Sequence, residues 1–443
     1  MTAPLGLPLS AGQEAMWFLH RLAPDSAAYN VLAAVRVRTA VDRAALRRAV
    51  LALAGRHEPL RSVFVERGGT ALRRHLPDGA VPFEVRELGD VPDERLFALA
   101  RAAGAAPFDL SEAWPFRVTL LCRAPEDAVL VLAAHHIVTD ATSQWLMLRD
   151  LLDAYAGRDL APLPGSYGEE VERERRSAGT PQRESAERYW AEVQDGAAPA
   201  TLTPDRPRPT GLTLRGATLT RPLPADTARR LAEAAGAAGV TPFAVLLGAF
   251  QSAVRRATGL DDFVIGCPAS TRVGGRAAEL VGYLVNSLPL RAAFTPDTTL
   301  TGAVAAAHRG LMEGLRRLRH PVRTPLFRLA VTLVAVDRLP VPGLLEPGGC
   351  GYARLRLELL DLPHMEGQFD LNVELRHGAD ALTLVLRYAS DLYDLSTVER
   401  FADIYVRMIE TAIEAPDTAV SDVPLVDRDQ LSELLDLGAG GDW

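Results

Sequence analysis

The first half of the chain carries apolar residues in two kinds of spacing, which predict a mixture of helices and strands. Apolar residues have helical spacing over 10–22 and over 142–155. A third helix is expected to begin at Asp42, which can act as its N-cap. Runs typical of strands form a second set, at 31–38, 61–66, 71–76, 116–122 and 128–134. This part of the chain is therefore expected to fold as an α/β unit.

The second half repeats the mixture loosely. Helices are expected at 225–238, 300–318 and 396–414, with another that begins at Thr241–Pro242. Strands are expected at 263–266, 355–360, 369–375 and 382–388. A proline-rich stretch with two charged helices separates the halves. The predicted division is an N-terminal lobe over 1–165, a linker with helices over 166–211, a C-terminal lobe over 212–430 and a C-terminal linker over 431–443.

Length and composition limit the classes of protein to consider. The chain has 443 residues, more than one hydrophobic core usually supports, with 48% hydrophobic and 23% charged residues. It has no apolar run long enough for a membrane span and no secretory signal, so the cytoplasm is the expected location. The net charge of −8 and the lack of a basic patch argue against nucleic acid as a partner. Three widely spaced cysteines indicate neither a disulfide framework nor a zinc site.

All the basic residues of the Lys/Arg class are arginines, because the sequence contains no lysine. A P-loop and a pyridoxal Schiff base both need a lysine, so both are excluded. Adenylating enzymes normally rely on a lysine as well. The chain is therefore not expected to activate its own substrate.

The residues with the clearest chemical potential follow the apolar run 128–134, which is typical of a strand buried on both faces. The run ends in His135 and His136, whose side chains should point to opposite sides of the strand and so do not suit one metal ion. Asp140 stands just before a helix, where it can cap backbone N–H groups or form an ion pair. The N–H groups of that helix start could stabilise an oxyanion. Taken alone, these residues fit polar packing as well as catalysis.

The segment His135-His136-Ile137-Val138-Thr139-Asp140-Ala141 resembles the HHxxxDG signature of condensation domains of nonribosomal peptide synthetases. Further segments resemble other motifs of that family, in the same order along the chain. They are residues 9–19, residues 56–64, the pair 264–268 and 282–291, and the pair 369–375 and 388–393. The resemblance spans nearly the whole chain.

The resemblance implies a fold and a set of partners. The fold is two lobes, each like chloramphenicol acetyltransferase, arranged as a V-shaped pseudo-dimer with a central tunnel. Donor and acceptor carrier proteins, of the peptidyl type or with an acyl carrier protein as donor, dock at opposite mouths, beside neighbouring synthetase domains. Each delivers its substrate as a thioester on a phosphopantetheine arm, and an amide forms. The chain itself is expected to bind no cofactor and no metal, and to be a monomer.

The resemblance also implies roles for individual residues. His136 matches the catalytic histidine, which acts as a base or positions the amine, and His135 supports it. Asp140 matches a structural aspartate that pairs with an arginine, for which Arg61 is our first candidate and Arg291 our second. Removing one partner of such a buried pair harms folding.

Ala141 departs from the family pattern, which has glycine at this position. Either the methyl group narrows the acceptor channel or the change is neutral; alanine in a left-handed backbone would cost about 1 kcal/mol, whereas in a helix it is harmless. Asn372, Asn286 and Ser143 are candidates to line the tunnel.

Two alternatives to amide formation remain open. One is an ester-forming or other acyltransferase relative. The other is a non-catalytic, condensation-like recruitment domain, although such relatives usually lose the second histidine, which this chain keeps as His136. The donor and acceptor groups, and whether the chain stands alone or belongs to a longer synthetase, are not readable from these residues.

Overall fold

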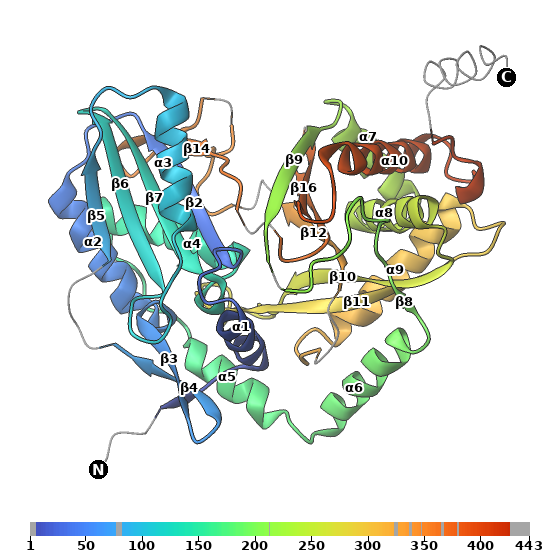
Figure 1. The fold of residues 1–443 in the computed structure, drawn as a ribbon, viewed down its shortest axis with the longest axis horizontal. Helices are drawn as coiled ribbons and strands as arrows, with labels where there is room; N and C mark the ends of the chain where they lie inside the picture. The colour runs from blue at the N-terminus through green and yellow to red at the C-terminus, as the bar shows by residue number, and fades with distance from the viewer. Residues whose placement is uncertain are drawn as a thin grey trace.

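Two β-sheets, one for each half of the chain, organise the molecule (Figure 1). The computed structural model describes residues 6–76, 82–211, 213–322, 327–335, 339–346, 348–364, 367–378 and 381–425. The expected C-terminal linker at 431–443 lies outside the described residues. The helices α5 (Tyr167–Arg176) and α6 (Pro181–Gln194) connect the two halves, within the segment expected to be a linker.

The first sheet has six strands in the order β13-β14-β2-β7-β6-β5. Its members from the first half are β2 (Asn30–Val37), β5 (Phe83–Glu87), β6 (Phe116–Ala124) and β7 (Asp127–His135). The helices α3 (Asp93–Ala105) and α4 (Ala141–Tyr155) pack on it, and α2 (Arg43–Arg56) packs against α4. Every residue of β7 is buried, because β2 and β6 flank it and its side chains face the core on both sides.

A smaller sheet supports the start of the chain. It has the order β1-β4-β3, from β1 (Leu7–Pro8), β3 (Ser62–Arg67) and β4 (Thr70–His75). The strands predicted at 61–66 and 71–76 form an antiparallel hairpin, and Gly68 and Gly69 in its turn both have a positive φ. Beside this sheet lie α1 (Ala11–Leu22), which Ser10 caps with a capping box, and the short 3₁₀ helix η1 (Glu58–Arg61).

The second sheet has the strand order β11-β10-β12-β15-β16-β9, with β8 (Ala198–Pro199) paired to β10. Its other strands are β9 (Gly216–Pro222), β10 (Asp262–Ser270), β11 (Val285–Ala293), β12 (Leu329–Ala335), β15 (Leu371–His377) and β16 (Leu382–Ala389). The helices of this lobe among the described residues are α7 (Thr227–Ala237), α8 (Pro242–Thr258), α9 (Leu300–Arg316) and α10 (Leu395–Glu414), and the 3₁₀ helix η4 (Val420–Asp422) follows them. Thr241 caps α8 and Pro242 begins it, as predicted.

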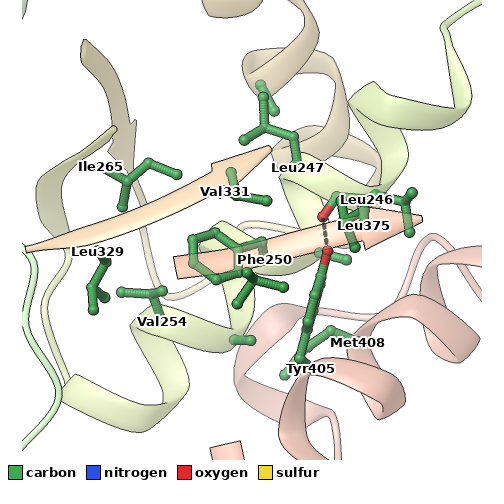
Figure 2. Packing of buried hydrophobic residues seen from close by; sticks show 14 of the residues in the cluster. Leu246, Leu247, Phe250, Val254, Ile265, Leu329, Val331, Leu375, Tyr405 and Met408 are labelled. Carbon is green, nitrogen blue, oxygen red and sulfur yellow. Dashed lines mark hydrogen bonds between the residues drawn. The ribbon is translucent and has the colours of Figure 1, made fainter. Parts of the chain in front are cut away.

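The core of this lobe forms where α8 packs between the sheet and α10 (Figure 2). Phe250 of α8 is fully buried and meets Tyr405 of α10 edge to face, with ring centroids 5.5 Å apart. The Tyr405 hydroxyl donates a hydrogen bond of 3.0 Å to the Leu246 carbonyl, so the polar end of this ring is satisfied. Tyr405 thus fixes α10 against α8.

One strand pair joins the sheet of the other half. We expected residues 355–360 to belong to the C-terminal lobe, but β14 (Leu355–Leu360) pairs with β2, and β13 (Cys350–Tyr352) pairs with β14. Leu355 and Leu357 accordingly enter the hydrophobic core of the first lobe. Strand propensity predicted β14 but not its partner, because pairing depends on contacts far apart in sequence.

Among the residues described, no single helix is long and apolar enough to cross a membrane. Helices α7 and α8 reach that length only together, across a bend of 99°.

Candidate functional site

The turn after β7 holds the two histidines. His135 ends the strand, and His136 begins a short 3₁₀ helix, η2 (His136–Val138). The Ile137 N–H donates to Nδ1 of His135 at 3.1 Å, so the first imidazole caps this turn. On the other side, Nε2 of Gln13 in α1 donates to the Ile137 carbonyl at 3.0 Å. The turn is therefore fixed both from within and from the first helix.

The His136 ring has one defined tautomer. Its Nδ1 lies 2.7 Å from the Thr139 carbonyl oxygen, which can only accept, so Nδ1 carries the hydrogen. A neutral ring then keeps its lone pair on Nε2. Burial lowers the pKa of His136, against the raising effects of the Thr139 carbonyl and the Asp140 carboxylate. The residue is partly exposed, and Tyr283 meets the ring edge to face with a centroid distance of 5.2 Å.

His135 has different neighbours from His136, in keeping with the predicted alternation. It is buried, and its ring contacts those of His20, Tyr29 and Phe108. Burial lowers the pKa of His135 well below its usual value, so the ring is neutral at pH 7. Among the residues described, no group of three or more His, Cys, Asp or Glu side chains is placed to hold a metal ion.

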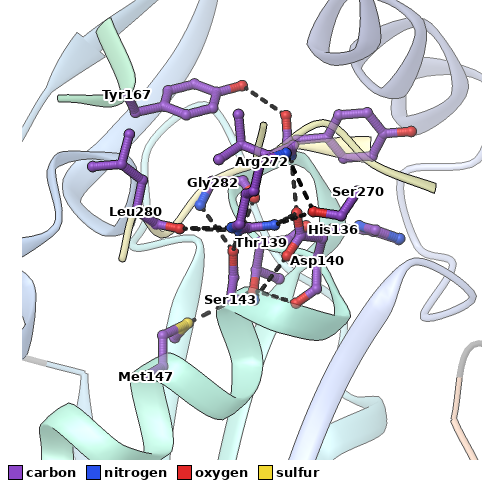
Figure 3. A network of polar contacts seen from close by, with 12 residues as sticks. His136, Thr139, Asp140, Ser143, Met147, Tyr167, Ser270, Arg272, Leu280 and Gly282 are labelled. Carbon is purple, nitrogen blue, oxygen red and sulfur yellow. Dashed lines mark hydrogen bonds and ion pairs between the residues drawn. The ribbon is translucent and has the colours of Figure 1, made fainter. Parts of the chain in front are cut away.

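Asp140 joins the two lobes through a buried ion pair with Arg272 (Figure 3). Its Oδ1 accepts from the Ser143 N–H at 2.7 Å, so Asp140 caps α4 as predicted. Its Oδ2 accepts from Nη1 of Arg272 at 2.7 Å and from the Leu284 N–H at 3.0 Å. Burial would raise the pKa of Asp140, but the Arg272 charge and these hydrogen bonds lower it overall. Asp140 is therefore an ionised anchor of residues 271–284, the segment between β10 and β11.

The predicted partners of Asp140 were wrong. Arg61 forms no ion pair with Asp140, and its Nε is buried without a hydrogen-bond partner. Arg291 lies on β11 and pairs with Asp262, 2.7 Å from Nε to Oδ1. Both arginines belong to recognisable motifs, which made them candidates, whereas Arg272 lies between two motifs. Neither Arg61 nor Arg291 is part of the ion pair that holds the active turn.

Two of the three tunnel-lining candidates have structural contacts instead. Ser143 is fully buried, and its Oγ accepts from Nη2 of Arg272 at 2.6 Å and from the Gly282 N–H at 3.0 Å. Asn286 donates to the carbonyls of Leu318 and His320 and accepts from the Val322 N–H. Ser143 thus ties α4 to the second lobe, and Asn286 fixes the chain that follows α9.

Asn372 and Ala141 remain candidates to contact a substrate. Asn372 lies on β15 between two core residues, so its side chain is on the opposite face of the sheet, and its buried Oδ1 has no hydrogen-bond partner. Ala141 is the first residue of α4 and is exposed. Its backbone does not have a positive φ, so alanine causes no strain there.

Sequence reasoning missed three residues that shape the site: Gln13, Arg272 and Tyr283. Gln13 lies within the motif at residues 9–19 but was given no role, yet it is buried and holds the η2 turn. Tyr283 stands inside the 282–291 motif, so the motif could have indicated it. A methyl group on Gly12 would come 2.3 Å from the Tyr283 ring, which explains the glycine in α1. Arg272 has no local signal, because its partner is 132 residues away.

Comparison with known proteins agrees with this geometry. The family described as the condensation domain matches residues 6–435. A probable non-canonical nonribosomal peptide synthetase, CymA of Salinispora arenicola, is 33% identical over 98% of this chain and 6% of its own length. Phosphinothricin tripeptide synthetase PhsC of Streptomyces viridochromogenes is 31% identical over 98% of this chain and 41% of its own. The chain thus spans well under half the length of these relatives.

Solved structures share the fold. The X-domain from teicoplanin biosynthesis superposes with a TM-score of 0.85 at 24% identity, covering 96% of this chain and 99% of that one. SgcC5 from Streptomyces globisporus superposes with a TM-score of 0.77 at 26% identity, covering 93% and 100%. The predicted fold class, two lobes like chloramphenicol acetyltransferase, is confirmed. The chain belongs to the condensation domain family of nonribosomal peptide synthetases.

Proposed function

We propose that this chain catalyses amide formation between a donor acyl or peptidyl thioester and an acceptor aminoacyl thioester, both held on carrier proteins. The observation that supports this proposal most directly is the tautomer of His136. Its Nδ1–H donates to the Thr139 carbonyl, and the lone pair is on Nε2. The lowered pKa of His136 keeps this lone pair available at neutral pH. It can accept a proton from the attacking amine or orient that amine by a hydrogen bond.

The start of α4 supplies donors for the oxyanion that forms when the amine attacks the thioester carbon. The first N–H groups of a helix have no acceptor within it. Asp140 takes the N–H of Ser143, which leaves those of Ala141 and Thr142, both exposed residues that follow the histidine turn. Replacing the usual glycine by Ala141 keeps this N–H. The thiolate of the donor arm leaves as the tetrahedral intermediate collapses to the amide.

The substrates are proposed to reach His136 through a tunnel between the lobes, with carriers docked at its two mouths. His136 is only partly buried, but it does not line the cavities of about 730, 580 and 690 Å³ found among the described residues. Asn372, whose Oδ1 lacks a partner, is our candidate for a polar contact along this route. The phosphopantetheine arms belong to the carriers, so the chain needs no cofactor of its own.

The test uses two carriers, one loaded with a donor thioester and one with an acceptor aminoacyl thioester. We expect His136→Ala to lower the rate of amide formation by roughly 10²–10⁴-fold, the usual contribution of a general acid or base. Asn372→Ala is expected to raise the acceptor KM without removing product. His308→Ala, at a partly buried histidine of α9, is the matched control and should leave the rate unchanged. Unimpaired condensation by His136→Ala would refute the proposed role.

A recruitment function is the second candidate, because of the high structural likeness to X-domains. A complex of the teicoplanin X-domain with OxyB superposes with a TM-score of 0.83 at 25% identity. The same assay separates the candidates. A wild-type chain that binds loaded carriers yet forms no amide with any donor and acceptor pair would favour recruitment. Product formed only with a hydroxyl-bearing acceptor would indicate the ester-forming alternative.

A further inference from the structure

A cavity lies in the first lobe, away from the histidine turn. Its volume is about 730 Å³, within the range of small-molecule sites. The C-terminal end of α2, the 3₁₀ helix η1 and residues 157–166 form most of its lining, and Leu280 and Val281 close one side. His136 is not part of this lining. The cavity is therefore distinct from the proposed site of condensation.

Four arginines line this cavity: Arg48, Arg56, Arg61 and Arg158. Two of them have partners, since Arg56 pairs with Asp150 and Arg158 with Asp153. The side chain of Arg61 forms no hydrogen bond or ion pair with any residue the structure describes, and its Nε is buried. Arg48 is exposed on α2 and likewise forms no ion pair within the described ranges. Neither Arg48 nor Arg61 is therefore neutralised by a carboxylate among the residues described.

Glu58 and Asp150, the buried or partly buried acidic residues near this cavity, are already engaged, whereas Asp159 is exposed and unpaired among the described residues. Glu58 lies in the lining, but its Oε1 accepts from Arg73 at 3.0 Å and from the Gly168 N–H at 2.7 Å. Asp150 accepts from Nε2 of His57 at 2.9 Å as well as from Arg56. Asp159 is exposed and forms no ion pair with the described arginines. Among the described residues, no carboxylate pairs with Arg48 or Arg61, so their charges can meet an anion in this cavity.

Much of the remaining lining is apolar. Leu160, Pro162 and Leu163 come from the segment after α4, and Leu280 and Val281 come from the segment that Asp140 and Arg272 anchor. An inorganic anion alone would leave this surface uncovered. An organic group attached to the anion would bury it.

We propose that this cavity binds a phosphate ester, with its phosphate between Arg48 and Arg61 and its organic part against the apolar side. Guanidinium groups suit phosphate, because their planar N–H pairs match two of its oxygens. A monoester carries a charge of roughly −1.5 to −2 at pH 7, enough to pair with both free arginines. The ester has two sources, a free nucleotide or a phosphopantetheine group, which share this chemistry.

Isothermal titration calorimetry with three phosphate-containing probes tests the proposal. The probes are inorganic phosphate, ADP and phosphopantetheine. Adenosine is the unphosphorylated counterpart of ADP, and pantetheine is that of phosphopantetheine. We expect at least one phosphate ester to bind more tightly than both inorganic phosphate and its own counterpart. Arg48→Gln and Arg61→Gln should each weaken that binding ~10-fold or more, the loss expected for a charge-assisted hydrogen bond. Arg309→Gln, at an exposed arginine of α9, is the matched control and should bind like the wild type.

The two sources give different results. Tighter binding of ADP indicates a nucleotide site, and tighter binding of phosphopantetheine indicates the arm of a carrier. Because Arg48 is exposed, Arg48→Gln should fold even if Arg61→Gln does not. His136→Gln should bind the ester unchanged, so the result is independent of the proposed condensation. Undiminished binding by Arg48→Gln, or no binding of either ester to the wild type, would overturn the proposal.

Discussion

The two histidines of the turn have different roles, one structural and one that can face a substrate. His135 is buried, caps the turn through Nδ1 and is neutral, so it shapes the backbone. His136 is partly exposed and has a free Nε2, so it is the ring that can meet a substrate. The Thr139 carbonyl sets its tautomer. Adjacent residues of one type thus acquire separate roles from the direction in which each points.

The titration of His136 is the first prediction. Because burial lowers its pKa, we expect a midpoint below the usual 6.5. The sign follows from linkage: a folded pKa below the unfolded one stabilises the fold above pH 6.5, and this contribution is lost as the pH falls. The measurement is NMR of the imidazole signals, assigned by the one missing in His136→Gln. A midpoint at or above 6.5 would mean that the ring is not desolvated as described.

At this scale, local chemistry was predictable and distant partners were not. Asp140 as a helix cap followed from its position before an apolar helical pattern, and the structure confirms it. Its partner Arg272 is 132 residues away, and many arginines in the chain could satisfy the same charge. The choice of Arg61 rested on its motif, and a motif does not say which contact its residue makes.

The elements around the turn are held by few but specific contacts. Helix α1 contributes Gln13 to the turn, and the segment between β10 and β11 contributes Tyr283 and Arg272. The starts of α1 and α8 were predictable, because Ser10 and Thr241 cap them locally. The route of residues 271–284 across the lobe interface was not, because no hydrophobic period describes an irregular segment.

The second prediction concerns that segment. Arg272→Ala leaves Asp140 buried without its cation, so we expect a loss of about 3–5 kcal/mol in the free energy of unfolding. Arg276→Ala in the same segment is the control. Arg276 pairs with Glu169 at the surface, so its loss should cost at most about 1 kcal/mol. Urea unfolding of both variants measures the difference, and equal costs would mean that Asp140 does not depend on Arg272.

The whole molecule is more interwoven than its linear order indicates. The chain returns from the second lobe to add β13 and β14 to the first sheet, and residues 271–284 contact α4 of the first lobe. These two connections between the lobes, in addition to α5 and α6, limit how the lobes can move apart. Together they hold Tyr283 against His136. A site made by both lobes depends on this fixed arrangement of the lobes, since a small displacement of one lobe would separate the groups that the site brings together. Apart from β13 and β14, the assignment of residues 212–430 to a C-terminal lobe stays a prediction.

The third prediction tests this connection through Leu357. It is fully buried in the core of the first lobe, although it lies in the second half of the sequence. We expect Leu357→Ala to lower the free energy of unfolding by about 2–5 kcal/mol, the range for such truncations in a core. Leu333→Ala, on β12 of the second sheet and 37% exposed, is the control, with an expected cost below about 1 kcal/mol.

Tryptophan fluorescence during chemical unfolding reports this effect, because Trp17, Trp114 and Trp145 all pack against the core of the first lobe. If β14 completes that core, Leu357→Ala moves the transition seen by these tryptophans to lower denaturant concentration. If the first lobe were stable without β14, the tryptophan transition would stay in place while another probe changed. The first outcome requires that residues from both halves of the chain fold together before His136 and Tyr283 can meet.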